Sequence, residues 1–140
     1  MRHPVFAGGK RLRPMLCLAA AEACGRDPGH AVIPACAIEL IHTYSLVHDD
    51  LPSMDNDGLR RGKPTTHVIF GENVAVLAGD ALLTEAFAII AQTPEGKKYR
   101  TADYVTELAA GSDSRRLIGG QVMVLVAEGK SLTRAQLARI

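Results

Sequence analysis

Tryptophan is absent from this 140-residue chain, and only 4% of its residues are aromatic. Proteins that hold single-stranded nucleic acid stack its bases on aromatic side chains, so this composition argues against such a role. The net charge is also small, at +1 from 16 basic and 15 acidic residues, so no overall field attracts nucleic acid or an anionic membrane. We therefore expect no nucleic-acid partner, and any electrostatic function must be local.

Cysteines are few, and all three lie in the first 36 residues: Cys17, Cys24 and Cys36. The odd number and the lack of a recognisable signal sequence favour a reducing compartment, so we expect a cytoplasmic protein with buried free thiols. No hydrophobic run reaches the ~18 residues needed to cross a bilayer, so we predict no transmembrane segment.

Alternating strand patterns are also missing, whereas apolar residues recur at helical spacing in every long segment. With 47% hydrophobic residues, the chain can form one modest core. We predict an all-α protein of about five or six helices, in a single domain spanning 1–140. The expected helices cover 14–24, 31–50, 73–92, 98–118 and 120–129, and a capping box of Thr133 and Gln136 begins a last helix that runs to the chain end.

Two of these helices carry specific expectations. Leu51-Pro52 should end the helix 31–50, because the residue before proline disfavours helical geometry. The following polar segment 51–66 is predicted to be a loop. The helix 73–92 is apolar on nearly all sides, which predicts a central position. Asp80 on it is then expected to be a buried, hydrogen-bonded carboxylate rather than a ligand.

An acidic cluster follows the helix 31–50 directly. Carboxylates at a helix C-terminus are disfavoured by the helix dipole, so a cation is the natural compensation. Mg²⁺ takes one or two protein carboxylates and completes its shell with water and phosphate oxygens, whereas the spacing of an EF-hand is missing. Arginines that come next could bind the same phosphate. A solvated acidic turn followed by a basic turn is the alternative. The residues are Asp49, Asp50, Asp55 and Asp57, then Arg60, Arg61 and Lys63.

The segment HDDLPSMDNDGLRRGKPTTH resembles the first aspartate-rich motif, DDxxxxD followed by RRG, of trans-prenyl diphosphate synthases, closest to bacterial farnesyl and geranylgeranyl diphosphate synthases. Upstream, GGKRLRP at 8–14 is similar to another motif of that family. Downstream, GENVAVLAGDALLTEAF and the GGQ at 119–121 resemble two more. The four motifs come in the family's order and spacing, so the resemblance implies part of the all-α isoprenoid (terpenoid) synthase fold.

The resemblance also implies roles for particular residues. It implies Mg²⁺ as cofactor, and condensation of isopentenyl diphosphate with an allylic diphosphate, dimethylallyl or geranyl. Family members are commonly homodimers. By resemblance, Asp49, Asp50 and Asp55 are the catalytic metal ligands, Arg60 contacts the allylic diphosphate, and Lys10, Arg13, His42 and Arg61 bind isopentenyl diphosphate.

Product length is implied by residues just before the acidic cluster. Tyr44 lies five residues before Asp49, about 7.5 Å along a helix. In the resembled family, a bulky aromatic there closes the pocket into which the product grows. Together with Ser45 and the inserted Leu51-Pro52, Tyr44 predicts farnesyl diphosphate as the product.

The chain also departs from the family. The resemblance covers less than half of the family's usual length, is truncated at both ends and lacks the second aspartate-rich motif. Val124 stands where the family has aspartate, and Arg115-Arg116 where it has small residues. We therefore expect no appreciable activity from this chain alone. A non-catalytic partner subunit of a full-length synthase and a fragment of a class I terpene cyclase are the alternatives, and GGKRLRP with RRGKP favours chain elongation over cyclisation.

Overall fold

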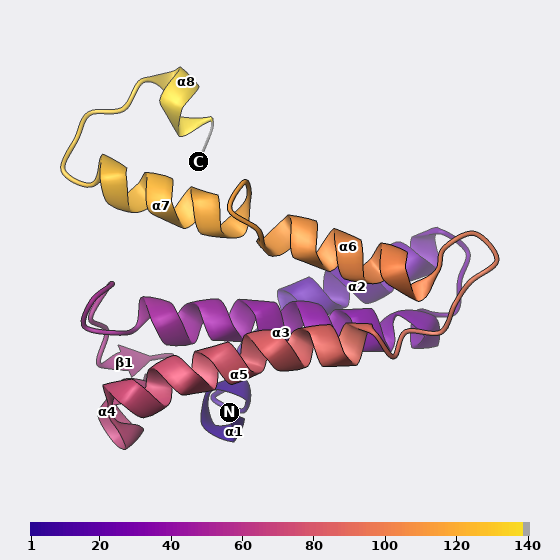
Figure 1. Cartoon of the computed structure of the whole chain (residues 1–140), viewed down its shortest axis with the longest axis horizontal. Helices are drawn as coiled ribbons and strands as arrows, with labels where there is room; N and C mark the ends of the chain where they lie inside the picture. Colours follow the sequence, from indigo (N-terminus) through magenta and orange to yellow (C-terminus); the bar gives the residue numbers. More distant parts are fainter. Residues whose placement is uncertain (139–140) are drawn as a thin grey trace.

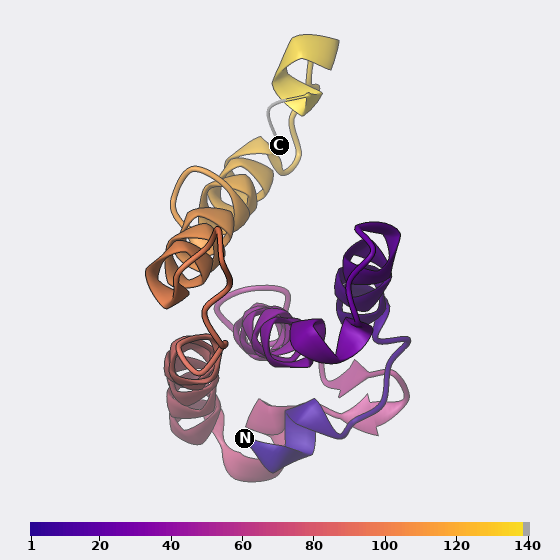
Figure 2. The same cartoon turned by 90° about the vertical axis from the view of Figure 1, so that its right-hand side faces the viewer.

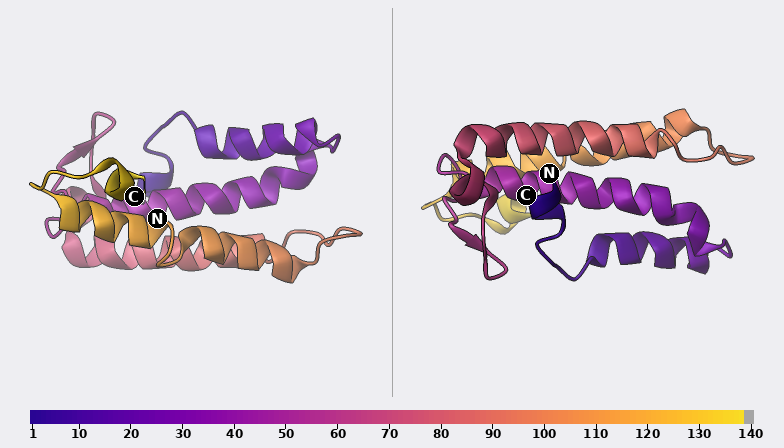
Figure 3. Two further views of the ribbon diagram at one scale, coloured as in Figure 1. Left: turned by 90° about the horizontal axis from the view of Figure 1, so that it is seen from above. Right: turned by 90° about the horizontal axis from the view of Figure 1, so that it is seen from below.

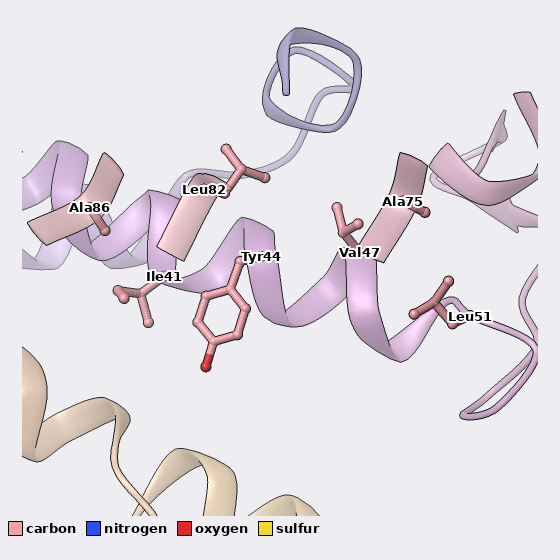
Figure 4. Close-up of a cluster of buried hydrophobic side chains, with 7 residues drawn as sticks. All are labelled: Ile41, Tyr44, Val47, Leu51, Ala75, Leu82 and Ala86. Atoms are coloured by element: carbon pink, nitrogen blue, oxygen red, sulfur yellow. The ribbon is translucent and has the colours of Figure 1, made fainter. Parts of the chain in front are cut away.

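A computed structural model describes residues 1–138 of the chain. Two long helices, α3 (Val32–Asp49) and α5 (Glu72–Ile90), lie antiparallel and side by side at its centre (Figure 1). Figure 4 shows the core between them, in which Leu82 and Val47 are the largest fully buried side chains. Alanines on α5 allow a close approach of the two helices. The cluster comprises Ile41, Tyr44, Val47, Leu51, Ala75, Leu82 and Ala86.

Gly79 of α5 also serves this close approach. The His48 imidazole of α3 lies over it, with Nε2 3.0 Å from the Val76 carbonyl oxygen, and a Cβ at position 79 would overlap the ring. Glycine is required here for packing, because no side chain has room.

The remaining helices surround this pair. Figure 2 shows α3 near the middle, with α2 (Leu12–Ala23) on one side and α5 and α6 (Thr101–Ser112) on the other. Seen from above and below, the axes of these four helices are roughly aligned, although neighbouring helices such as α3 and α5 run in opposite directions (Figure 3). A 3-10 turn, η1, precedes α3, and α7 continues beyond α6. The bounds are α1 Arg2–Val5, η1 Pro28–Ala31, α4 Thr66–Phe70, α7 Leu117–Ala127 and α8 Arg134–Leu137.

The prediction of an all-α protein is confirmed. Each predicted helical segment contains a helix, and α3 ends at Asp49, before Leu51-Pro52, as expected. The capping box is present too, since Thr133 Oγ1 accepts from the Gln136 N–H while Gln136 Oε1 accepts from the Thr133 N–H. The predicted extension of this helix to 139–140 lies outside the described residues.

The segment 51–66 is not wholly a loop. Strands β1 (Leu59–Arg60) and β2 (Lys63–Pro64) form a minimal antiparallel hairpin within it. Arg61 and Gly62 connect them with φ of 56° and 74°. Two positive φ angles define a type I′ turn, which matches the twist of a hairpin. The short pairing was invisible in the sequence because Lys63-Pro64 lacks an alternating pattern.

The predicted helix 98–118 is interrupted, because α6 covers Thr101–Ser112 and α7 begins only at Leu117. Asp113 has extended geometry, and its Oδ1 accepts from the Arg115 N–H at 2.8 Å. An aspartate that bonds to the backbone two residues ahead favours a turn over a helix. The helix therefore ends at Ser112, and the chain turns before α7. Arg115 reaches solvent from this turn and pairs with Asp113.

The central position predicted for the helix 73–92 is met on one side of α5 only, and the prediction of buried thiols is wrong. Helix α5 buries one face only, and Val74, Val76 and Leu77 of its other face are exposed. Cys24 and Cys36 are exposed and Cys17 is half-buried, so the thiols are free but not buried. An apolar neighbourhood in sequence did not determine burial, because the apolar faces of these helices exceed what residues 1–138 cover.

Two stretches pass a length and hydropathy test for membrane spans: Pro28–Asp49, with mean hydropathy 1.3, and Glu72–Ile90, with 1.6. Both contain the helices that form the core between α3 and α5, and core helices of soluble proteins also pass this test. The absence of a transmembrane segment stays a prediction.

Candidate active site

The acidic cluster begins where α3 ends. The chain folds back at once, with the Met54 and Asn56 N–H groups donating to the Leu51 carbonyl and the Asp55 N–H donating to the Asp49 carbonyl at 2.9 Å. This turn places Asp55 beside Asp49. Burial raises the pKa of Asp49 above its usual value, and the neighbouring Asp55 carboxylate raises it further. A cation between or beside two carboxylates that repel one another in this way would relieve the repulsion.

Asp50 differs from its two neighbours. Its side chain is buried, at 6% exposed, and its Oδ1 accepts from Arg60 Nε at 2.5 Å. Burial raises the pKa of Asp50, while the bond to Arg60 acts in the opposite direction. The resemblance grouped Asp50 with Asp49 and Asp55 as a metal ligand, but in this structure its carboxylate is committed to Arg60.

Arg60 itself bridges two acidic residues. Besides Asp50, it reaches Asp57 through Nη2 at 3.2 Å. A guanidinium carries N–H groups on three nitrogens, and Nη1 takes part in neither bond. Spacing alone did not reveal the pair of Asp50 and Arg60, because it depends on the turn and hairpin that bring position 60 back to the end of α3.

The loop before α2 meets the hairpin turn. Arg61 Nη1 donates to the Gly8 carbonyl, and its guanidinium lies against Gly9 so closely that a Cβ there would overlap it. Gly8 and Gly9 have φ of 103° and 130°, a region that favours glycine. The paired glycines thus allow the loop to pass beside Arg61.

Four basic side chains proposed by resemblance come together in one open pocket. Lys10, Arg13, His42 and Arg61 all line it, from the loop, α2, α3 and the hairpin turn. Burial lowers the pKa of His42, and the charge of Arg13 lowers it further, against a smaller opposite effect of Glu39. None of the ion pairs within residues 1–138 involves Lys10, Arg13 or Arg61. Their charges are therefore available to an anion.

Sequence reasoning missed one acidic residue of this pocket. Glu39 lies one turn before His42 on α3, and its Oε1 accepts from Arg11 Nη1 at 2.5 Å. The i, i+3 spacing from Glu39 to His42 was the available signal, since it places both on one helix face. Because Arg11 is paired with Glu39, it is not available to an anion in the way that Lys10 and Arg13 are.

The two residues connected with product length lie on the same helix. Tyr44 is buried in the core beside Ile41 (Figure 4). The centroid of its ring lies 5.8 Å from that of the His48 ring. Ser45 is half-buried and donates to the His42 carbonyl at 3.0 Å.

Asp80 corrects an expectation. Its side chain is 60% exposed, and the contact made by its Oδ1 is with His48 Nε2 at 3.7 Å. It is therefore not a buried, hydrogen-bonded carboxylate, because it lies on the uncovered side of α5.

The donor set decides which metal the site suits. Within residues 1–138 no three His, Cys, Asp or Glu side chains come together as a ligand group. A closed Zn²⁺ or Ca²⁺ site needs more ligands than the pair of Asp49 and Asp55 supplies. Mg²⁺ accepts one or two carboxylates with water and substrate phosphate, so the residues present suit it.

Comparison with known proteins adds to this geometry. The family model described as polyprenyl synthetase matches residues 1–139. The chain is 48% identical to the farnesyl diphosphate synthase of Geobacillus stearothermophilus, covering 100% of this chain and 48% of that protein. It is 52% identical to the heterodimeric geranylgeranyl pyrophosphate synthase large subunit 1 of Arabidopsis thaliana, covering 94% of this chain and 36% of the relative.

Among solved structures, an FPP/GFPP synthase from Zymomonas mobilis superposes with a TM-score of 0.87 at 40% identity. The match covers 99% of this chain and 51% of that one. The chain thus spans about a third to a half of the length of the proteins it matches.

Proposed function

Because this chain belongs to the polyprenyl synthetase family, we propose that it forms part of an enzyme condensing isopentenyl diphosphate with dimethylallyl or geranyl diphosphate. The pocket of Lys10, Arg13, His42 and Arg61 carries this proposal. Four basic or polarisable side chains from four segments converge there, whereas the chain as a whole is nearly neutral. Such a concentration of charge suits a small polyanion such as a diphosphate.

Each group has a role in this proposal. Lys10, Arg13, His42 and Arg61 bind the diphosphate of isopentenyl diphosphate. Arg60 uses its remaining Nη1 donors for the allylic diphosphate, while Asp50 and Asp57 orient it. Asp49 and Asp55 would hold Mg²⁺, which neutralises charge on the departing diphosphate when bound.

Calorimetric titration of the chain with pyrophosphate, with and without Mg²⁺, tests these assignments. We expect Asp49→Asn/Asp55→Asn to remove the part of the binding that depends on Mg²⁺. Lys10→Gln/Arg13→Gln should weaken binding in both conditions. Equal affinity of wild type and both variants would contradict the proposal.

We further propose farnesyl diphosphate as the product. Relatives of both the farnesyl and the geranylgeranyl type match the chain, so the support comes from the position of Tyr44. An apolar pocket of about 350 Å³ lies further along α3, lined by Pro34, Ile38 and Ile41 together with Leu108 of α6. The Tyr44 ring stands on α3 between the acidic cluster and this pocket.

The test is Tyr44→Ala in a whole enzyme that contains this segment. Removing the ring should open the way to the pocket and lengthen the products, separated by chromatography. Cys36→Ala, at an exposed position of the same helix that does not line the pocket, is the control. Unchanged product length in Tyr44→Ala would contradict the role of Tyr44.

A further inference from the structure

One carboxylate lies among the cations of the diphosphate pocket. Glu39 projects from α3, and its side chain is only 12% exposed. A carboxylate at this place lowers the positive potential that attracts a diphosphate. Its presence therefore calls for a reason other than attraction of the substrate.

Arg11 supplies that reason. Its Nη1 donates to Glu39 Oε1 and its Nη2 donates to the Val5 carbonyl oxygen, both at 2.5 Å. One guanidinium thus joins three segments: the end of α1, the loop before α2, and the middle of α3. A planar, forked donor can hold two acceptors in fixed directions, which a lysine ammonium cannot do as rigidly.

The backbone conformation of Arg11 also indicates that this residue is held in a fixed position. Its φ is 51°, in the left-handed region that costs a non-glycine residue roughly 1 kcal/mol. Arg11 is also the residue immediately before α2, so its conformation sets the direction in which that helix leaves the loop. Lys10 precedes this bend and Arg13 lies in the first turn after it, so both depend on its geometry.

We propose that Arg11 and Glu39 are positioning residues, which fix the loop 8–13 to α3 so that Lys10 and Arg13 face His42 and Arg61. This inference rests on the proposed function, because it assigns the pocket to a diphosphate. Neither Arg11 nor Glu39 is required to touch the ligand. Their effect is to keep Lys10, Arg13 and Arg61 arranged with His42 for one anion before it arrives, which reduces the entropy lost on binding.

If Glu39 positions the loop, Glu39→Gln should change pyrophosphate affinity in the opposite direction from that expected if only its charge mattered. Glu39→Gln removes a negative charge, so attraction alone would tighten the binding of an anion. Loss of the ion pair, in contrast, frees Arg11 and loosens the loop, which weakens binding. We expect Glu39→Gln to weaken pyrophosphate binding about tenfold, the size seen when a group that orients a ligand side chain is removed.

A second substitution separates the two effects without changing the net charge. Arg11→Lys keeps the cation, but its single ammonium group cannot reproduce both bonds of the guanidinium. Attraction alone predicts unchanged affinity, whereas positioning predicts a loss similar to that of Glu39→Gln. Glu22→Gln is the control, since it makes the same charge change on the exposed far end of α2.

The experiment combines calorimetric titration with pyrophosphate and amide hydrogen exchange in the whole chain. We expect faster exchange of the amides of 8–13 in Glu39→Gln and Arg11→Lys, with protection of α5 unchanged. Exchange of the loop is measured without ligand, so it reports on positioning even if binding is weak.

The outcomes are distinct. Equal or tighter pyrophosphate binding by Glu39→Gln, or unchanged exchange of the loop, would overturn the positioning role. If wild type and Glu22→Gln alike fail to bind pyrophosphate, the proposed function itself is overturned, and this inference with it.

Discussion

The region around the basic pocket, where α1, the loop before α2 and the β1–β2 hairpin meet α3, is held together differently from the segment after Ser112. We call this region the charged end. At the charged end, contacts join residues far apart in sequence, such as His3 Nε2 with the Pro64 carbonyl and Arg61 with the Gly8 carbonyl. After Ser112, side-chain bonds are local, as between Asp113 and Arg115 or from Lys130 to the Val126 carbonyl. The pocket of Lys10, Arg13, His42 and Arg61 is therefore built where distant segments of the chain meet, whereas α7 depends little on the rest of the fold.

The same contrast appears in the apolar surface. The core between α3 and α5 is closed, while α7 exposes four neighbouring apolar side chains: Val122, Val124, Leu125 and Val126. Contiguous apolar surface promotes association, so we expect the isolated chain to aggregate.

The largest difference between the two regions is expected for leucine truncation. Leu82→Ala leaves a cavity between α3 and α5, because its side chain is 1% exposed, and should lower the free energy of unfolding by about 2–5 kcal/mol. Leu125→Ala on α7, where the leucine is 42% exposed, should cost less than ~1 kcal/mol. Urea denaturation followed by circular dichroism measures both. Equal losses would show that α7 is as tightly integrated as the core.

Replacing glycine by alanine should change the stability of the folded chain in opposite directions at two positions. Gly79→Ala inserts a methyl group into the space of the His48 ring, and such overpacking costs about 1–3 kcal/mol. Gly111→Ala in the last turn of α6 meets nothing within 4 Å, and the better helix propensity of alanine should stabilise the chain by at most about 0.5–1 kcal/mol. The melting temperature should fall for the first and rise for the second. A rise for both would mean that His48 moves away from α5 without cost.

Ion pairs of the two regions provide a smaller contrast. Asp50→Asn removes the buried partner of Arg60, so we expect a loss of about 1–2 kcal/mol in unfolding free energy. Asp113→Asn weakens the pair with Arg115, which is 83% exposed, and exposed pairs contribute little to stability because water and salt screen them. Thermal denaturation in 0.1 M and 1 M salt compares them, since salt screens only the exposed pair. A larger loss for Asp113→Asn would contradict this ranking.

Long periodic segments could be predicted from the sequence for a physical reason. Helices α2, α3 and α5 carry apolar residues at helical spacing over many turns, and Pro52 supplies an unambiguous stop for α3. The break at Asp113 could not be read in the same way, because one side-chain bond to the Arg115 N–H outweighs an otherwise helical pattern.

The site was predicted in part. Lys10, Arg13, His42 and Arg61 share a pocket, but the resemblance carried them, since lone cations in a sequence give no signal of convergence. The commitment of Asp50 to Arg60 depends on the type I′ turn at Arg61-Gly62, a feature of three-dimensional geometry. The exposure of Asp80 and Cys36 depends on which other elements cover each helix face. The spacing of apolar residues in the sequence does not reveal this.

The smallest effect concerns pH and His42. Burial and Arg13, followed by Arg61 and Arg60, lower the pKa of His42 in the folded chain, with Glu39 acting the other way. The unfolded chain binds this proton near pH 6.5, so it holds more protons than the folded chain below that pH. The stabilisation is therefore fully present above about pH 6.5 and is lost as the pH falls, by at most about 1.4 kcal/mol per pH unit for one proton.

We expect the difference in unfolding free energy between wild type and His42→Asn to shrink from pH 7.5 to pH 5.5. Comparing the two proteins at each pH cancels the opposite contribution of the raised carboxyl pKa values of Asp49 and Asp50, which both share. A difference that stays constant or grows toward pH 5.5 would show that His42 becomes charged without cost in the folded pocket.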